Sequence, residues 1–265
     1  MSHYDQETAV SRISDDRWTG HINRQWNIGD NPNGGYLVST AMAAMLEAVD
    51  HPDPLTVTTH FLRPGVADAD CEIFVDVVRT GRTLSTVRAT LSQEGKSRLE
   101  LLAAFTDLSV PAGVDSSITL PLPVLPDPAD CLQRSGSDQG VDLPILDRLD
   151  TRLDPATASP GGSDQAVIQG MIRFADGRAP DSRSLLLFAD AFPPSPFSLL
   201  GSIGWVPTLE LTVHVRRRPA PGWIIGRLET DDLHEGRMVE SGALWDSQGF
   251  LVAQSRQIGL VMKRD

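Results

Sequence analysis

An internal repeat with an offset of 154 or 155 positions is the strongest constraint on the fold of this chain. Three kinds of landmark recur in the same order: an Arg-Pro that ends an alternating run, a Gly-Arg after an apolar run, and a glycine within a polar turn. They are Arg63-Pro64 and Arg218-Pro219, Gly81-Arg82 and Gly236-Arg237, and Gly95 and Gly249. Three matches at one offset predict two structural units of the same kind.

Each unit has the pattern of one helix followed by four strands. The first helix is predicted over 36–49, with strands near 55–63, 72–79, 84–93 and 97–107 because apolar residues alternate there. The second helix is predicted over 182–192, ended by Pro193-Pro194, with strands near 208–217, 222–230, 237–245 and 250–262. The second helix is apolar on nearly every side, so it must be enclosed. We therefore predict an α+β fold in which two curved antiparallel sheets, each wrapping a central helix, join into one.

The 265 residues accommodate two such units and a connection between them. The segment after the first four strands is rich in proline and has little periodicity, which is typical of a linker. We predict an N-terminal unit over 1–108, a linker over 109–141, and a C-terminal unit over 142–265.

Charge and composition exclude several classes of partner. The net charge is −12, which argues against binding to nucleic acid. No uninterrupted apolar run reaches about 18 residues and the N-terminus has no signal-peptide pattern, so we expect a cytoplasmic protein that does not enter a membrane.

Cys71 and Cys131 are far apart in sequence and have no partners at metal-ligand spacing, so we expect no metal site and no disulfide framework. Serine-hydrolase, zinc-protease and nucleotide-binding motifs are absent, and the six histidines are scattered.

Three polar residues of the second half are candidates for a site. Asp190 interrupts the apolar run of the second helix, and a buried carboxylate there is either bonded to the nearby loop or a tuned acid or base. Thr208 begins a strand on the same face as Glu210 and Thr212, where threonine is also simply a good strand residue. Gln257 shares a strand face with small residues, which leave room for a ligand; alternatively it is an exposed strand glutamine, since small residues also accommodate close packing.

The repeat separates these three residues from their counterparts. Asp190 corresponds to Gly35 or Tyr36, Thr208 to Asp53 or Pro54, and Gln257 to Ala103. Because the polar groups are not repeated together, a site that uses all three occurs once per chain.

The chain resembles the double-hotdog acyl-CoA thioesterases, the family of acyl-CoA thioesterase II, over nearly its whole length. The segments that carry the resemblance are NPNGGYL, THFLRPG, LLFAD, PTLELTVHVRRRPAPGW and ALWDSQGFLVAQSRQIGLV. The resemblance implies a catalytic Asp190, Thr208 and Gln257, all from the second unit. Family members commonly have GGQ where this chain has Gly34-Gly35-Tyr36, a difference that we expect to affect the choice of acyl chain.

The implied activity is hydrolysis of a fatty acyl-CoA by a water that Asp190 deprotonates, with Thr208 and Gln257 completing its hydrogen bonds and no cofactor. Backbone amides of Gly34, Gly35 and Tyr36 are candidates for substrate binding or an oxyanion hole, although the glycines could merely allow a tight turn.

Arg216, Arg217 and Arg218 would either meet coenzyme A phosphates or form a cluster held by salt bridges. We also expect a homo-oligomer that acts in lipid metabolism. The alternatives are a hotdog-fold hydratase or dehydratase and a non-catalytic acyl-CoA-binding protein.

Overall fold

The computed structural model describes residues 1–114 and 118–262. Residues 115–117 of the predicted linker and 263–265 of the predicted C-terminal unit lie outside the described residues. The elements of the first half are α1 (His3–Glu7), β1 (Val10–Arg12), β2 (Arg17–Ile22), the 3-10 helix η1 (Arg24–Trp26), β3 (Asn27–Ile28), β4 (Asn31–Pro32), α2 (Gly34–Glu47), β5 (Asp53–Phe61), β6 (Ala69–Thr80), β7 (Ser85–Gln93) and β8 (Lys96–Thr106).

The second half repeats this plan with more short elements before its four long strands. It consists of β9 (Leu132–Gln133), α3 (Gly136–Gln139), η2 (Pro144–Asp147), β10 (Leu149–Leu153), α4 (Pro155–Ala158), β11 (Val167–Phe174), α5 (Ser184–Phe188), α6 (Pro196–Leu200), β12 (Thr208–Val215), β13 (Ile224–His234), β14 (Arg237–Trp245) and β15 (Leu251–Leu260). All eight predicted long strands are present, with ends that differ by a few residues. The proposed division of the chain remains a proposal; β9 and α3 fall within its linker range of 109–141.

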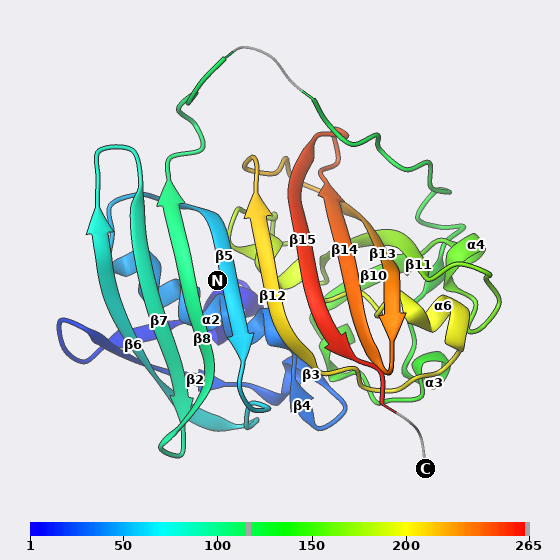
Figure 1. Ribbon diagram of the computed structural model, residues 1–265, viewed down its shortest axis with the longest axis horizontal. Coiled ribbons are helices and arrows are strands. Elements are labelled where there is room, and N and C mark those ends of the chain that lie inside the picture. Colours follow the sequence, from blue (N-terminus) through cyan, green and yellow to red (C-terminus); the bar gives the residue numbers. More distant parts are fainter. Residues whose placement is uncertain (115–117, 263–265) are drawn as a thin grey trace.

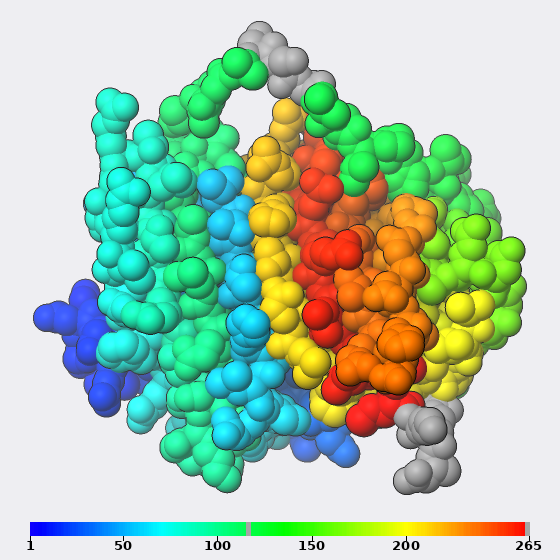
Figure 2. Space-filling view, in the orientation of Figure 1, coloured from blue at the N-terminus to red at the C-terminus, as the bar shows by residue number. Residues whose placement is uncertain are grey.

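The described residues of both halves share one 13-stranded antiparallel sheet, which confirms the continuous sheet predicted from the repeat (Figure 1). Its order is β1-β2-β6-β7-β8-β5-β12-β15-β14-β13-β11-β10-β9. The strand order of the second half is therefore the reverse of that of the first, about the junction of β5 and β12. These two strands pair with each other and lie side by side in Figure 2. Thr58 pairs there with its own repeat counterpart, Thr212, and their hydroxyl oxygens are 3.0 Å apart.

The helix α2 begins where Asn33 caps it. The Asn33 side-chain oxygen accepts a hydrogen bond from the backbone N–H of Tyr36 at 3.0 Å, and the helix continues for 14 residues. An N-cap of this kind satisfies one of the amides that a helix start leaves unpaired. The helix thus starts two residues before the predicted Tyr36, with Gly34 and Gly35 in its first turn.

The predicted second helix, 182–192, is wrong in extent, because α5 ends at Phe188 and Asp190 lies in the turn that follows. Pro193 and Pro194 have no N–H with which to continue the helical hydrogen bonds. Side chains from elsewhere instead satisfy the carbonyl groups of this turn: Asn33 donates to the Asp190 carbonyl at 3.0 Å, and Arg134 donates to that of Ala191. The early end of α5 is what frees the Asp190 side chain from a helix surface.

The core lies between the two central helices and the concave face of the sheet (Figure 1). All four apolar residues of α5, Leu185 to Phe188, are fully buried, as its apolar composition predicted. Helix α2 packs directly on α5. Burial on every side holds α5 in place although a five-residue helix is not stable in isolation.

Candidate active site

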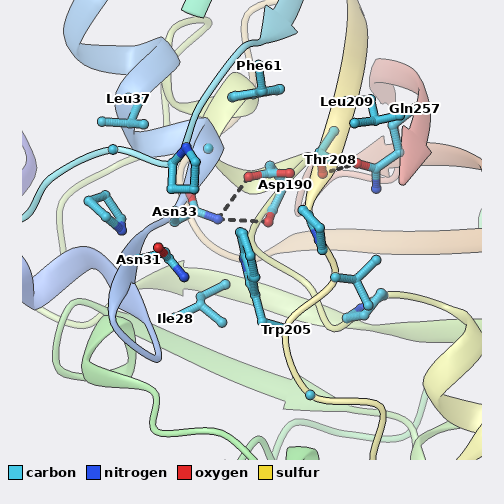
Figure 3. A pocket seen from close by; sticks show the side chains of 18 of the residues that line it. Ile28, Asn31, Asn33, Leu37, Phe61, Asp190, Trp205, Thr208, Leu209 and Gln257 are labelled. Carbon is cyan, nitrogen blue, oxygen red and sulfur yellow. Dashed lines mark hydrogen bonds between the residues drawn. The ribbon is translucent and has the colours of Figure 1, made fainter. Parts of the chain in front are cut away.

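A cavity of about 230 Å³ lies where the start of α2 meets the turn after α5 and the adjoining ends of β12 and β15 (Figure 3). The loop after β5 and the loop that precedes β12 complete its wall. Asp190, Thr208 and Gln257 all line it, so the structure brings the three predicted residues to one cavity. Most of the remaining wall is apolar, including Ile28, Leu37, Phe61, Phe192, Trp205, Leu209 and Met238.

The carboxylate of Asp190 is bound to the N-terminus of α2, in the other half of the chain. Its Oδ2 accepts a hydrogen bond from the backbone N–H of Gly35 at 2.7 Å and from the Asn33 side-chain amide at 2.9 Å. A helix N-terminus favours a negative charge through its free amides and its dipole. Among the hydrogen bonds between described residues, none involves Oδ1, and Figure 3 shows the carboxylate between Asn33 and Thr208.

Burial raises the pKa of Asp190 to about 6, although the donors of Gly35, Asn33 and the Gly34 backbone act in the opposite direction. The negative charge of Glu240 adds to the increase. A carboxylate with a pKa near 6 is ionised at neutral pH and is a stronger base than an ordinary aspartate.

Close packing explains why glycine precedes Tyr36. A Cβ on Gly35 would lie 2.9 Å from the Leu186 carbonyl oxygen and 2.9 Å from the Leu187 Cα, both backbone atoms of α5. A Cβ on Gly34 would lie 2.9 Å from the Phe61 ring and 3.0 Å from Oδ2 of Asp190. Neither glycine has a positive φ. They are required by the close approach of α2 to α5 and to Asp190, rather than by a tight turn.

The amides expected to bind substrate are largely engaged. The Gly35 N–H donates to Asp190, and the Tyr36 N–H donates to the cap Asn33. The Tyr36 ring is fully buried outside the cavity wall, where its hydroxyl donates to the Glu7 carbonyl at 2.6 Å. Gly34 is the member of this set that lines the cavity. A substrate-binding or oxyanion role for Gly34, Gly35 and Tyr36 stays a prediction.

Thr208 lies on the opposite face of its strand from the one predicted. The register of β12 against β15 shifts between Thr208 and Glu210, so a β-bulge separates Thr208 from the outward-facing Thr212. Such a bulge redirects a side chain without ending the strand. Thr208 consequently turns inward and donates a hydrogen bond from Oγ1 to Oε1 of Gln257 at 3.0 Å.

Gln257 is 8% exposed and lies on the inner face of β15 with Ala253 and Gly259. Its Nε2 donates to Oε1 of Glu240, which lies directly opposite on β14 and is 1% exposed. The other carboxylate oxygen of Glu240 accepts from the Ser195 backbone N–H at 2.6 Å. Thr208, Gln257 and Glu240 thus form one hydrogen-bonded chain that leads away from the cavity.

Asn33, Arg134 and Glu240 were not predicted as site residues. Arg134 lines the cavity, is 4% exposed, and donates to Gln139 and to the Ala191 carbonyl. Burial lowers its pKa to about 9, so it is still charged at neutral pH. Nothing in the sequence marked Arg134, whereas Glu240 had a signal because it occupies an inward position between Met238 and Leu244.

Arg216, Arg217 and Arg218 are not among the described residues of the cavity wall, and Arg218 forms salt bridges. Arg218 binds Asp53 at 2.6 Å and Asp107 at 3.1 Å, and the Arg217 guanidinium lies over the Phe250 ring. Within the described ranges, no three His, Cys, Asp or Glu residues are grouped as a metal site would require. No helix in the described part of the chain has the length and apolar character needed to cross a bilayer.

Comparison with known proteins agrees with this architecture. Residues 22–106 match the family model of the acyl-CoA thioesterase N-terminal domain, and residues 127–261 match that of the C-terminal domain. An uncharacterized protein of Mycobacterium tuberculosis is 28% identical over 91% of this chain and 90% of its own length.

Solved structures give the same result. The chain is similar to a Thermobifida fusca protein provisionally named thioesterase II, with a TM-score of 0.89, 31% identity, and coverage of 99% of this chain and 98% of the other. It has the fold of the acyl-CoA thioesterase II TesB2 of Mycobacterium marinum, with a TM-score of 0.78, 19% identity and 99% of each chain covered. The chain belongs to the acyl-CoA thioesterase family, as a thioester hydrolase with two hotdog units in one continuous sheet.

Proposed function

We propose that the chain hydrolyses a fatty acyl-CoA to the free acid and coenzyme A by direct attack of water, with Asp190 as the general base. The observation that carries this proposal is the place of the Asp190 carboxylate. One oxygen is fixed by Asn33 and Gly35, while the other has no partner among the described residues, in a cavity that also holds Thr208 and Gln257.

In the proposed reaction, Oδ1 of Asp190 accepts a proton from a water in the cavity as the water oxygen bonds to the thioester carbonyl carbon. The carbon–sulfur bond then breaks, and the thiolate of coenzyme A takes up the proton from Asp190. General base catalysis of this kind contributes about 10²–10⁴-fold to a rate. The raised pKa of Asp190, about 6, supports this role because the group is both ionised and basic at neutral pH.

Thr208 and Gln257 would hold the water. The Thr208 hydroxyl proton is directed to Gln257, so its oxygen is available to accept a hydrogen bond from the water. A water that donates one proton to Asp190 and the other to Thr208 keeps its lone pairs free for the carbonyl carbon. No covalent acyl-enzyme is needed.

The acyl chain would contact the apolar wall, of which Leu37, Phe61 and Trp205 are large members. Contact with such a wall favours an apolar acyl group, because each buried methylene contributes about 0.8 kcal/mol. The proposal keeps the expected cytoplasmic location, role in lipid metabolism and homo-oligomeric state; sedimentation of the purified chain would measure its oligomeric state.

Thiol release from a panel of acyl-CoA chain lengths tests this function. We expect release by the unmutated protein, its loss in Asp190→Asn, and its retention in Cys71→Ala, because Cys71 lies outside the cavity wall. Hydration of an enoyl-CoA without thiol release would instead indicate a hydratase, and saturable binding without turnover would indicate a binding protein. Either result would overturn the proposal. No histidine is among the described residues of the cavity wall, so the Asp/His pair typical of a hydratase is not present there.

A further inference from the structure

Glu240 is a buried carboxylate that the proposed mechanism does not use. It lies behind Gln257 on β14 and is not part of the cavity wall. Both of its oxygens accept hydrogen bonds, Oε1 from the Gln257 side chain and Oε2 from the Ser195 backbone N–H. Burying a carboxylate is costly unless it is well bonded, so this position is an expensive one for a residue with only a packing role.

The hydrogen bond from Gln257 to Glu240 fixes which group donates and which accepts along the whole series Thr208, Gln257 and Glu240. A glutamine amide has a donor end and an acceptor end of nearly the same shape, and it can turn by 180° at little steric cost. In its ionised form this carboxylate can only accept hydrogen bonds, so Nε2 then faces Glu240. Burial raises the pKa of Glu240, whereas the hydrogen bonds from Ser195 and Gln257 favour the ionised form. The amide oxygen of Gln257 then faces Thr208, whose hydroxyl must donate to it.

We propose that Glu240 is a positioning residue that sets the polarity of the hydrogen bonds between Gln257 and Thr208, and through them the orientation of the attacking water. This inference rests on the proposed hydrolysis. With the amide reversed, Nε2 would face Thr208, and the Thr208 hydroxyl would point its proton into the cavity. That proton would bind the lone pair with which the water must attack.

Glu240 also acts on Asp190 through its charge. The ionisable groups around the cavity are Asp190 in the turn after α5, Glu240 on β14, Arg134 after β9, and Arg63 in the loop after β5. The start of α2 contributes the Asn33 and Gly35 donors rather than a charged side chain. The pKa of Asp190 is raised by Glu240, so removing the Glu240 charge lowers it.

Glu240→Gln tests the proposal, because it keeps the shape of the side chain and removes both the charge and the obligate acceptor. We expect kcat to fall by roughly 10- to 100-fold, since misplacement of a reacting group has effects of this size. KM should change little. The acidic limb of the kcat/KM profile should move to lower pH from its position near pH 6 in the unmutated protein.

Asp246→Asn is the matched control. Asp246 is also a 1% exposed carboxylate, but it lies just beyond the other end of β14, and among the described residues its donors are backbone amides of nearby turns. Its variant is expected to leave the pH profile in place. A Glu240→Gln protein with the kcat and acidic limb of the unmutated protein would overturn the inference.

Glu240→Asp covers the case in which Glu240→Gln does not fold. It keeps the charge and withdraws the acceptor by one methylene, so kcat should fall while the acidic limb stays in place. An unchanged kcat in Glu240→Asp would also overturn the inference. Failure of the proposed function is a separate result, because the unmutated protein would then release no thiol from any acyl-CoA.

Discussion

The two halves of the chain have the same order of helix and long strands, and they differ at the central helix that each half packs against the common sheet. Helix α2 of the first half has 14 residues and a capped N-terminus, whereas α5 of the second half has five residues and ends in an irregular turn. The long helix supplies the backbone N–H of Gly35 at its start, and the turn after the short helix supplies Asp190, which accepts a hydrogen bond from it. Neither half contains a complete site, and each provides what the other lacks.

The difference follows from the position of these residues near the axis that relates the halves. Asp190 meets Gly35, the residue that corresponds to it at an offset of 155. Two carboxylates in this place would face each other and repel, and Gly35 has no room even for a methyl group. A site at this axis can therefore be built once, and the repeat must be broken to build it.

The largest expected effect comes from the acidic member of this pair. Asp190→Asn keeps an acceptor for Gly35 and removes the base, so kcat for thioester hydrolysis should fall by about 10²–10⁴-fold. The comparison is Asp53→Asn, at the position in the first half that corresponds to Thr208. Asp53 forms a salt bridge with Arg218 and does not line the cavity. Asp53→Asn should retain its kcat per folded molecule; equal losses in the two variants would contradict the division of roles between the halves.

A smaller effect is expected at the bulge of β12. Thr208→Ala should lower kcat by roughly 10- to 100-fold, because the proposed water loses an acceptor and Gln257 loses a donor. Thr212→Ala removes the same hydroxyl four residues along the same strand, where it binds Thr58 on the outer face. Steady-state kinetics should show no change in Thr212→Ala. A similar loss in both would mean that the strand, rather than the inward-turned hydroxyl, matters.

The contact between the helices predicts a loss of stability. Gly35→Ala should lower the free energy of unfolding by about 1–3 kcal/mol, because its Cβ would overlap the α5 backbone. Chemical denaturation followed by circular dichroism measures this difference. In Gly113→Ala, by contrast, the new Cβ meets nothing within 4 Å, and a change below about 0.5 kcal/mol is expected. A stable Gly35→Ala would show that α2 and α5 can separate without harm.

The pKa of Asp190 predicts a smaller gain in stability when the carboxylate is removed. Because folding raises this pKa from 3.8 to about 6, the folded state holds the proton more tightly, and its stability decreases as pH rises between these values. Asp190→Asn should thus be more stable than the unmutated protein at pH 7, by about 1–2 kcal/mol after the weaker hydrogen bonds of an amide are considered. The gain should shrink below pH 6 and vanish near pH 4. Thermal unfolding across this range measures it, and a gain that persists at pH 4 would point to another cause.

The strands and the double-unit plan could be predicted because their signals are local. Alternation and turn glycines mark each strand of the meander, and the repeat at one offset predicts two units in one sheet. Asp190 and Gln257 also stood out locally, as a carboxylate in an apolar run and a glutamine among small residues.

The remaining features depend on contacts between distant segments. The end of α5 depends on Asn33 and Arg134, which bind its last carbonyl groups from positions far away in the chain. The inward direction of Thr208 depends on a bulge whose register is set by β15. Strict alternation assigned Thr208 to the face of Glu210 and Thr212 for this reason. Glu240 could have been found by extending the same parity argument to β14, where an acidic residue occupies an inward position.

The junction of β5 and β12 has a consequence for synthesis of the chain. The edge of β5 is complete once residue 61 has been made, but its partner β12 ends only at residue 215. At about 5–20 residues per second, roughly 8–30 s pass before β12 is available. During this time the unpaired edge of the nascent N-terminal unit can pair with another chain, since exposed edges are templates for strand addition. The junction that joins the two halves of the finished enzyme thus also leaves an edge open to aggregation until β12 has been made.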